Sequence, residues 1–77
     1  MITKKTIAAW ISEKRKETGI TQETLAKEAE ISRGHLSNIE NGWDDPTALV
    51  LSNIAAAIDS FECSQLLSRF KKATRSN

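Results

Sequence analysis

The sequence predicts an all-α fold, more specifically a compact five-helix bundle, and three observations point to it. Ala, Glu, Lys, Leu and Ile are abundant, and these residues favour helices. The chain has no alternating apolar run from which a strand could be built. Its 77 residues are enough for one small domain. We therefore expect residues 1–77 to form a single helical domain.

The first helix is expected to begin near Thr3 or Thr6, either of which can cap it, and to run to Thr18. Gly19 follows in the position that favours a left-handed residue. The residues of this helix predicted to face the core have helical spacing and are Ile7, Ala8 and Ile11. Trp10 lies beside them.

The second and third helices are predicted to be short and adjacent. The second begins at Thr21, whose hydroxyl can cap it, and ends near Glu30. Its buried side is expected to be Leu25, Ala26 and Ala29. Ser32 can cap the third helix, which runs to about Asn41 before a left-handed exit at Gly42.

The fourth helix is expected to start at Asp45 or Thr47, because either residue can cap it around Pro46. Its apolar stripe is Ala48, Leu51, Ile54, Ala55 and Ile58. Ser60 is expected to cap a separate fifth helix, with Phe61, Leu66, Leu67 and Phe70 as its apolar positions. We predict that this helix and the C-terminal tail, residues 60–77, serve dimerisation.

The composition argues against an enzyme, a metal site or a cofactor. Cys63 is the only cysteine, and no His/Cys cluster could hold zinc. His35 is the only histidine and has no catalytic partner at a recognisable spacing. No stretch approaches the roughly 18 apolar residues of a membrane span, and a signal-peptide pattern is absent. We expect a cytoplasmic protein with no membrane partner.

The formal net charge is only +1, but the charges are unevenly distributed. Residues 1–40 contain seven Lys and Arg, whereas none occurs from Asn41 to Ser68. Basic side chains return near the C-terminus, from Arg69 to Arg75. An anionic partner should therefore contact the N-terminal half or the tail.

The second and third helices together have the pattern of a helix-turn-helix. Ala26 is small where two steeply crossing helices come close, and Ile31 is apolar in the connecting turn. Leu36 and Ile39 lie three residues apart and are expected to face the second helix.

The opposite face of the third helix carries small polar residues. Projection at about 100° per residue places Gly34, Ser37, Asn38 and Asn41 outward, with Arg33 and His35 at the flanks. This face has no carboxylate. Asn, Arg and Ser are residue types that read base edges in DNA, so the face is suited to a groove.

The segments RKETGITQETLA, ISRGHLSNIENG and DPTALVLSNIAAAI resemble the lambda-repressor-like helix-turn-helix proteins, which include the Cro and cI phage repressors and the XRE-type regulators. The resemblance extends from about Ile7 to Ile58. It implies a sequence-specific, double-stranded DNA-binding transcriptional regulator. The expected form is a homodimeric repressor that reads a pseudo-palindromic operator through the third helix in the major groove.

The resemblance also implies roles for individual residues. Base contacts are expected from Ser32, Arg33, Gly34 and Asn38. Phosphate contacts are expected from Gln22, Lys27, His35, Ser37 and Asn41, although for His35 an idle surface position is an equal alternative. Arg15 and Glu40 match a partly buried pair that ties the first helix to the third.

Some positions depart from the family pattern. Glu30 replaces the usual turn glycine, which implies a strain of roughly 1 kcal/mol or an altered turn. Asp44 and Asp45 weaken an expected phosphate contact. Trp10 and Trp43 are interpreted as packing residues, and Cys63 as a small buried or interface residue.

A small module reads few base pairs, so discrimination normally requires two copies. The dimer interface is predicted to include Leu49, Val50, Phe61, Leu66, Leu67 and Phe70. The recognition helices should lie about 34 Å apart, one DNA turn. Two alternatives remain: an antitoxin or restriction-modification controller of the same fold, and a protein-interaction module that docks a partner protein on the last two helices.

Overall fold

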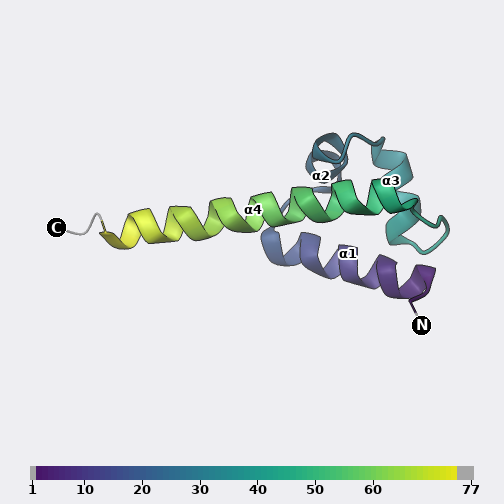
Figure 1. The fold of residues 1–77 in the computed structure, drawn as a ribbon, viewed down its shortest axis with the longest axis horizontal. Coiled ribbons are helices and arrows are strands. Elements are labelled where there is room, and N and C mark those ends of the chain that lie inside the picture. Colours follow the sequence, from purple (N-terminus) through teal and green to yellow (C-terminus); the bar gives the residue numbers. More distant parts are fainter. Residues whose placement is uncertain (1, 75–77) are drawn as a thin grey trace.

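The structure, a computed structural model, describes residues 2–74, with side chains as far as Phe70. Its helices are α1 (Lys4–Thr18), α2 (Gln22–Glu28), α3 (Arg33–Glu40) and α4 (Ala48–Thr74). No strand occurs within this described range, so the all-α prediction is confirmed. Figure 1 shows α1 along the first half of α4, α2 on the other side of that half, α3 at the end where α4 begins, and α4 continuing well past all of them.

The prediction of five helices is wrong, because the expected fourth and fifth helices form one helix of 27 residues. Ser60 lies inside this helix and caps nothing. No Gly or Pro occurs between Ala48 and Thr74, so the backbone hydrogen bonds continue through Ser60 without a break. The molecule is therefore elongated, with extents of 50 × 26 × 18 Å, and residues 75–77 of the predicted tail lie outside the described residues.

Each helix begins at a hydroxyl side chain. The hydroxyls of Thr3, Thr21, Ser32 and Thr47 accept hydrogen bonds from the backbone N–H three residues further on, at 3.0 to 3.3 Å. Such a cap satisfies a backbone donor that has no partner inside the helix. Of the alternatives left by the sequence, Thr3 rather than Thr6 caps α1, and Thr47 rather than Asp45 caps α4.

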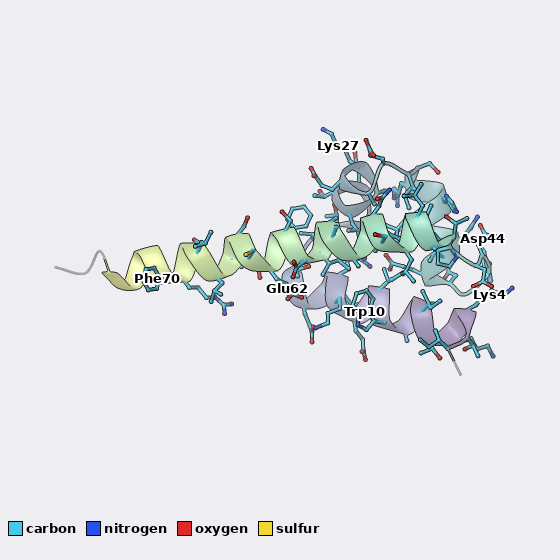
Figure 2. The ribbon with its side chains drawn as sticks, viewed as in Figure 1. Lys4, Trp10, Lys27, Asp44, Glu62 and Phe70 are labelled. Atoms are coloured by element: carbon cyan, nitrogen blue, oxygen red, sulfur yellow. The ribbon has the colours of Figure 1, made fainter. Side chains whose placement is uncertain are left out.

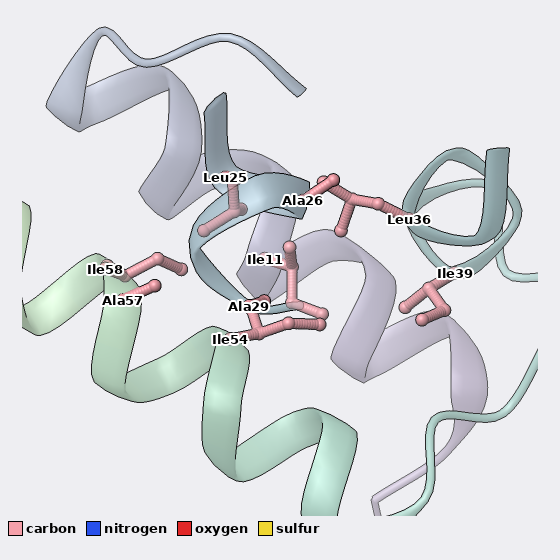
Figure 3. Close-up of a cluster of buried hydrophobic side chains, with 9 residues drawn as sticks. All are labelled: Ile11, Leu25, Ala26, Ala29, Leu36, Ile39, Ile54, Ala57 and Ile58. Carbon is pink, nitrogen blue, oxygen red and sulfur yellow. The ribbon is translucent and has the colours of Figure 1, made fainter. Parts of the chain in front are cut away.

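The core lies where all four helices meet (Figure 3). Its largest fully buried side chains come one or two from each helix: Ile11, Leu25, Leu36, Ile39 and Ile54. Burying one such side chain stabilises the fold by about 1.5–3 kcal/mol. The predicted stripes are mostly present, but Ala48 is exposed and Ala57, which the pattern did not indicate, is buried.

Glu30 adopts the left-handed backbone conformation, with φ of 61°. The turn after α2 is closed by hydrogen bonds from the Glu30 N–H to the Lys27 carbonyl and from the Ile31 N–H to the Ala26 carbonyl, at 3.2 and 3.0 Å. A side chain in this conformation is strained, whereas glycine is not. The left-handed backbone at Glu30 is therefore the geometric cause of the strain that the sequence predicted at this turn.

Two further predictions need correction. Trp43 does not pack, because its side chain is 70% exposed, and Trp10 is 40% exposed at the edge of the α1–α4 contact. The loop at Trp43 is held by its backbone instead, through an N–H bond of 2.9 Å to the carbonyl of Asn38. Cys63 is exposed, which excludes the buried alternative.

Within the described range, no helix is both long and apolar enough to cross a membrane.

Candidate nucleic-acid interface

The position of α3 is set by its buried side. Leu36 and Ile39 are fully buried, and Ala26 on α2 is 2% exposed. A small side chain at the crossing lets the two helix backbones approach closely. With its inner side packed in this way, α3 presents its other side to solvent at one end of the molecule (Figure 1).

The predicted base-contacting residues share this outer side. Ser32, Arg33 and Gly34 are exposed at the first turn of α3, and Asn38 follows one turn later, half-buried. Nothing lies within 4 Å of the place where a Cβ on Gly34 would be. The structure therefore brings the four predicted residues together on one accessible edge.

The carboxylate of α3 is withdrawn from this edge. Glu40 accepts hydrogen bonds from Nε and Nη2 of Arg15 at 2.9 to 3.2 Å, so the predicted structural pair is present. Arg15 also donates through Nη1 to the carbonyl of Ile20 at 3.1 Å. The Glu40 and Arg15 side chains are only 6% and 17% exposed. The pair therefore neutralises the acid and ties α1 to α3.

The predicted phosphate-contacting residues lie on α2 and α3, around the edge that carries the predicted base contacts. Gln22 is the first residue of α2 and lines a surface hollow with Arg33, Arg15, Thr21 and Glu23. The other predicted members are exposed or half-buried and lie along α3 or at its end: His35, Ser37 and Asn41. Lys27 points outward from α2 (Figure 2).

The loop after α3 places an exposed ring, which the sequence did not predict, beside the two carboxylates that were expected to weaken a phosphate contact. Trp43 is exposed directly beyond the end of α3, and Asp44 lies beside it in the same loop (Figure 2). The position of Trp43 after a left-handed glycine, in a loop with two carboxylates, is the signal that could have indicated an exposed ring. Asp44 and Asp45 make this end of the edge unfavourable for a phosphate.

The predicted dimer residues divide into two groups. Leu49, Leu66, Leu67 and Phe70 are 55 to 71% exposed. Val50 and Phe61 are half-buried, and Val50 packs against the core. Phe61 and Val50 therefore face the body of the molecule in part.

The helices α2 and α3 are short, a tight turn joins them, and α3 carries an accessible polar edge. These features define the class of helix-turn-helix proteins that place a recognition helix on DNA. A sequence profile of the Helix-turn-helix family matches residues 11–60. The chain belongs to this family of DNA-binding transcription regulators, whose members are not typically enzymes.

Two relatives extend the comparison. The chain is 42% identical over 59 residues to the ImmF control region 10 kDa protein of Bacillus phage phi105, a match that covers 77% of this chain. It is also 42% identical over 45 residues to the uncharacterized HTH-type transcriptional regulator YqaF of Bacillus subtilis, covering 58% of this chain. The matched part spans 66% and 59% of the two relatives' own lengths.

Proposed function

We propose that this chain regulates transcription as a sequence-specific DNA-binding protein, with α3 in the major groove of double-stranded DNA. The observation that carries the proposal is the edge formed by Ser32, Arg33, Gly34 and Asn38, which is accessible and free of carboxylates because Glu40 is bound to Arg15. The width of the major groove admits one α-helix. The site of action would be the cytoplasm.

Within this proposal the side chains of α3 read base edges. Arg33 can donate two hydrogen bonds to guanine, and Asn38 can form a bidentate pair with adenine. Gly34 lets the helix backbone approach the bases or water closely. Each good bidentate contact contributes about 1–3 kcal/mol of discrimination against the wrong base.

The phosphate contacts position the protein on the duplex. Gln22 at the start of α2, with Ser37 and Asn41 on α3, would bond to backbone oxygens through neutral groups. Lys27 and Arg33 would add positive charge, and His35 would add a further contact to the backbone. Binding should therefore weaken as salt rises, because bound cationic groups release counterions from the DNA.

The proposed active form is a homodimer on a pseudo-palindromic operator, with recognition helices about 34 Å apart. The exposed apolar side chains of α4 support an interface there. The similarity to a phage control region protein favours the role of a repressor in a phage or a mobile element.

The test is selection of bound duplexes from a random pool at a stated salt concentration, and an inverted repeat is expected. Arg33→Ala and Asn38→Ala should abolish retention of the selected duplex. Arg33→Lys is the matched control: it keeps the charge but loses the two-pronged donor, so binding to random DNA should persist while discrimination is lost. Failure of the wild-type chain to bind any duplex at low salt would contradict the proposal.

A protein-interaction role is the second candidate, favoured by the exposed Leu49, Leu66 and Leu67. In that case Arg33→Ala would leave partner binding intact. An antitoxin or restriction-modification controller would use the same DNA edge, so the genes beside its own would separate these roles.

A further inference from the structure

The continuity of α4 aligns exposed residues that the five-helix expectation kept apart. Leu49, Ala56, Cys63 and Phe70 follow one another at intervals of seven, and all are exposed. Leu66, 67% exposed, lies beside this row. We call these five residues the outer stripe of α4. Since seven residues make nearly two helical turns, the stripe forms one seam, opposite the core residues of α4.

We propose that the C-terminal half of the outer stripe pairs in an antiparallel manner with the same segment of a second copy, with Cys63 of each copy beside the partner's Leu66. The proposal rests on the homodimer proposed above and specifies its interface, orientation and register. An antiparallel helix pair has two-fold symmetry, as an isologous dimer requires.

Charge complementarity selects the second copy as the occupant. Asp59, Glu62, Cys63, Gln65, Leu66 and Arg69 line one shallow hollow on α4. Along the chain, Asp59 and Glu62 precede Cys63 and Leu66, and Arg69 follows them. Antiparallel pairing through Cys63 and the partner's Leu66 therefore places Glu62 opposite the partner's Arg69, and symmetry repeats this pair on the other side.

The alternative registers bring like charges together. Sliding one helix by one heptad in either direction places Glu62 opposite the partner's Glu62, or Arg69 opposite the partner's Arg69. A parallel pair would place Asp59 against the partner's Asp59 within the seam. In the proposed register Asp59 lies at the end of the seam, near the partner's Phe70, where its carboxylate can remain in water. Opposite charges at flanking positions are what set orientation in paired helices.

The body of the molecule holds this segment in a defined rotation. Gln65 donates a hydrogen bond from Nε2 to the carbonyl of Thr18. Glu62 lies 3.9 Å from Nζ of Lys14, and its side chain remains 45% exposed. These two contacts fix the rotation of α4 against α1, and Glu62 stays accessible beside α1 (Figure 2).

A charge exchange tests the register. Glu62→Arg and Arg69→Glu should each weaken the dimer by about tenfold or more, since each change replaces two attractive pairs with two repulsive ones. The double variant Glu62→Arg/Arg69→Glu restores opposite charges and should regain most of the wild-type dimer. Sedimentation equilibrium at low salt measures this, with circular dichroism confirming that every variant keeps its helices.

Cross-linking gives a second measurement. In the proposed register the two Cys63 residues are offset by about 4.5 Å along the helix axes, so each thiol faces the partner's residue 66 more directly than the partner's Cys63. Wild-type chains alone should therefore cross-link more slowly than a pair whose thiols face each other. A mixture of wild type with Cys63→Ser/Leu66→Cys should cross-link in mixed dimers, because each thiol then faces the other.

The outcomes separate this inference from the proposed function. A dimer that the double variant fails to restore, or that cross-links through Cys63 alone as fast as the mixture does, overturns the antiparallel register and leaves the homodimer in place. A wild-type chain that stays monomeric at tens of micromolar overturns both the dimer and its register. DNA reading by α3 is tested separately, by the duplex selection.

Discussion

Arg15 and Glu40 join α1 to α3 through hydrogen bonds of 2.9, 3.1 and 3.2 Å between one guanidinium and one carboxylate. The two residues are 25 positions apart in sequence. Their contact both fixes the recognition helix and removes a negative charge from its accessible edge. Stability and DNA recognition are therefore connected through this pair.

Breaking the pair should destabilise the protein. Arg15→Ala removes the cation that pairs with Glu40, a side chain only 6% exposed in the intact protein, and we expect a loss of about 3 kcal/mol in the free energy of unfolding. The Arg15→Met/Glu40→Leu double variant should recover much of that loss, because neither charge then remains buried. Urea denaturation of the three proteins measures both effects, and an unchanged midpoint for Arg15→Ala would contradict the structural role.

Relieving the turn should stabilise the protein. Glu30→Gly is expected to raise the free energy of unfolding by about 1 kcal/mol, since glycine adopts a φ of 61° without steric cost. Glu28→Gly is the matched control, because Glu28 ends α2 with helical backbone and should lose up to about 1 kcal/mol on this change. Opposite signs of the two shifts in thermal midpoint are the expected result, and equal signs would exclude backbone strain as the cause.

Gly34→Ala should separate stability from DNA binding. The position is helical and has open space around it, so alanine should stabilise the fold by about 0.5–1 kcal/mol. If α3 lies against the bases as proposed, the added methyl group should reduce affinity for the selected operator. Thermal denaturation and titration of labelled duplex DNA measure the two effects, and an unchanged operator affinity would show that DNA does not approach this position closely.

Salt dependence should distinguish charged from neutral phosphate contacts. Lys27→Ala is expected to reduce the slope of log affinity against log salt by about 1, because one cationic contact is lost. Gln22→Ala should lower affinity at every salt concentration and leave the slope unchanged, since glutamine carries no charge. Titrations between low and physiological salt measure both slopes. A change in slope on Gln22→Ala would argue against the proposed neutral contact.

Local chemistry made much of the fold predictable. Hydroxyl side chains before apolar periodic segments predicted the helix starts, and Thr21 and Ser32 cap as expected. The spacing of Leu36 and Ile39 predicted which side of α3 is buried. The accessible edge with Arg33, Gly34 and Asn38 followed from the same projection.

The wrong predictions concerned residue types that are compatible with more than one local structure. Ser60 can cap a helix or continue one, and only the uninterrupted backbone of α4 distinguishes the two. Trp43 is as apolar as a core residue, but its loop is anchored through the backbone and leaves the ring exposed.

The helix starts and the helix-turn-helix motif depend on interactions between residues three or four positions apart, and such interactions are visible in the amino-acid order alone. Contacts between distant segments decided the rest: Arg15 reaches Glu40, Gln65 reaches Thr18, and four helices meet in one core. Packing in three dimensions left one face of α4 uncovered, and that outcome depends on where every other helix lies.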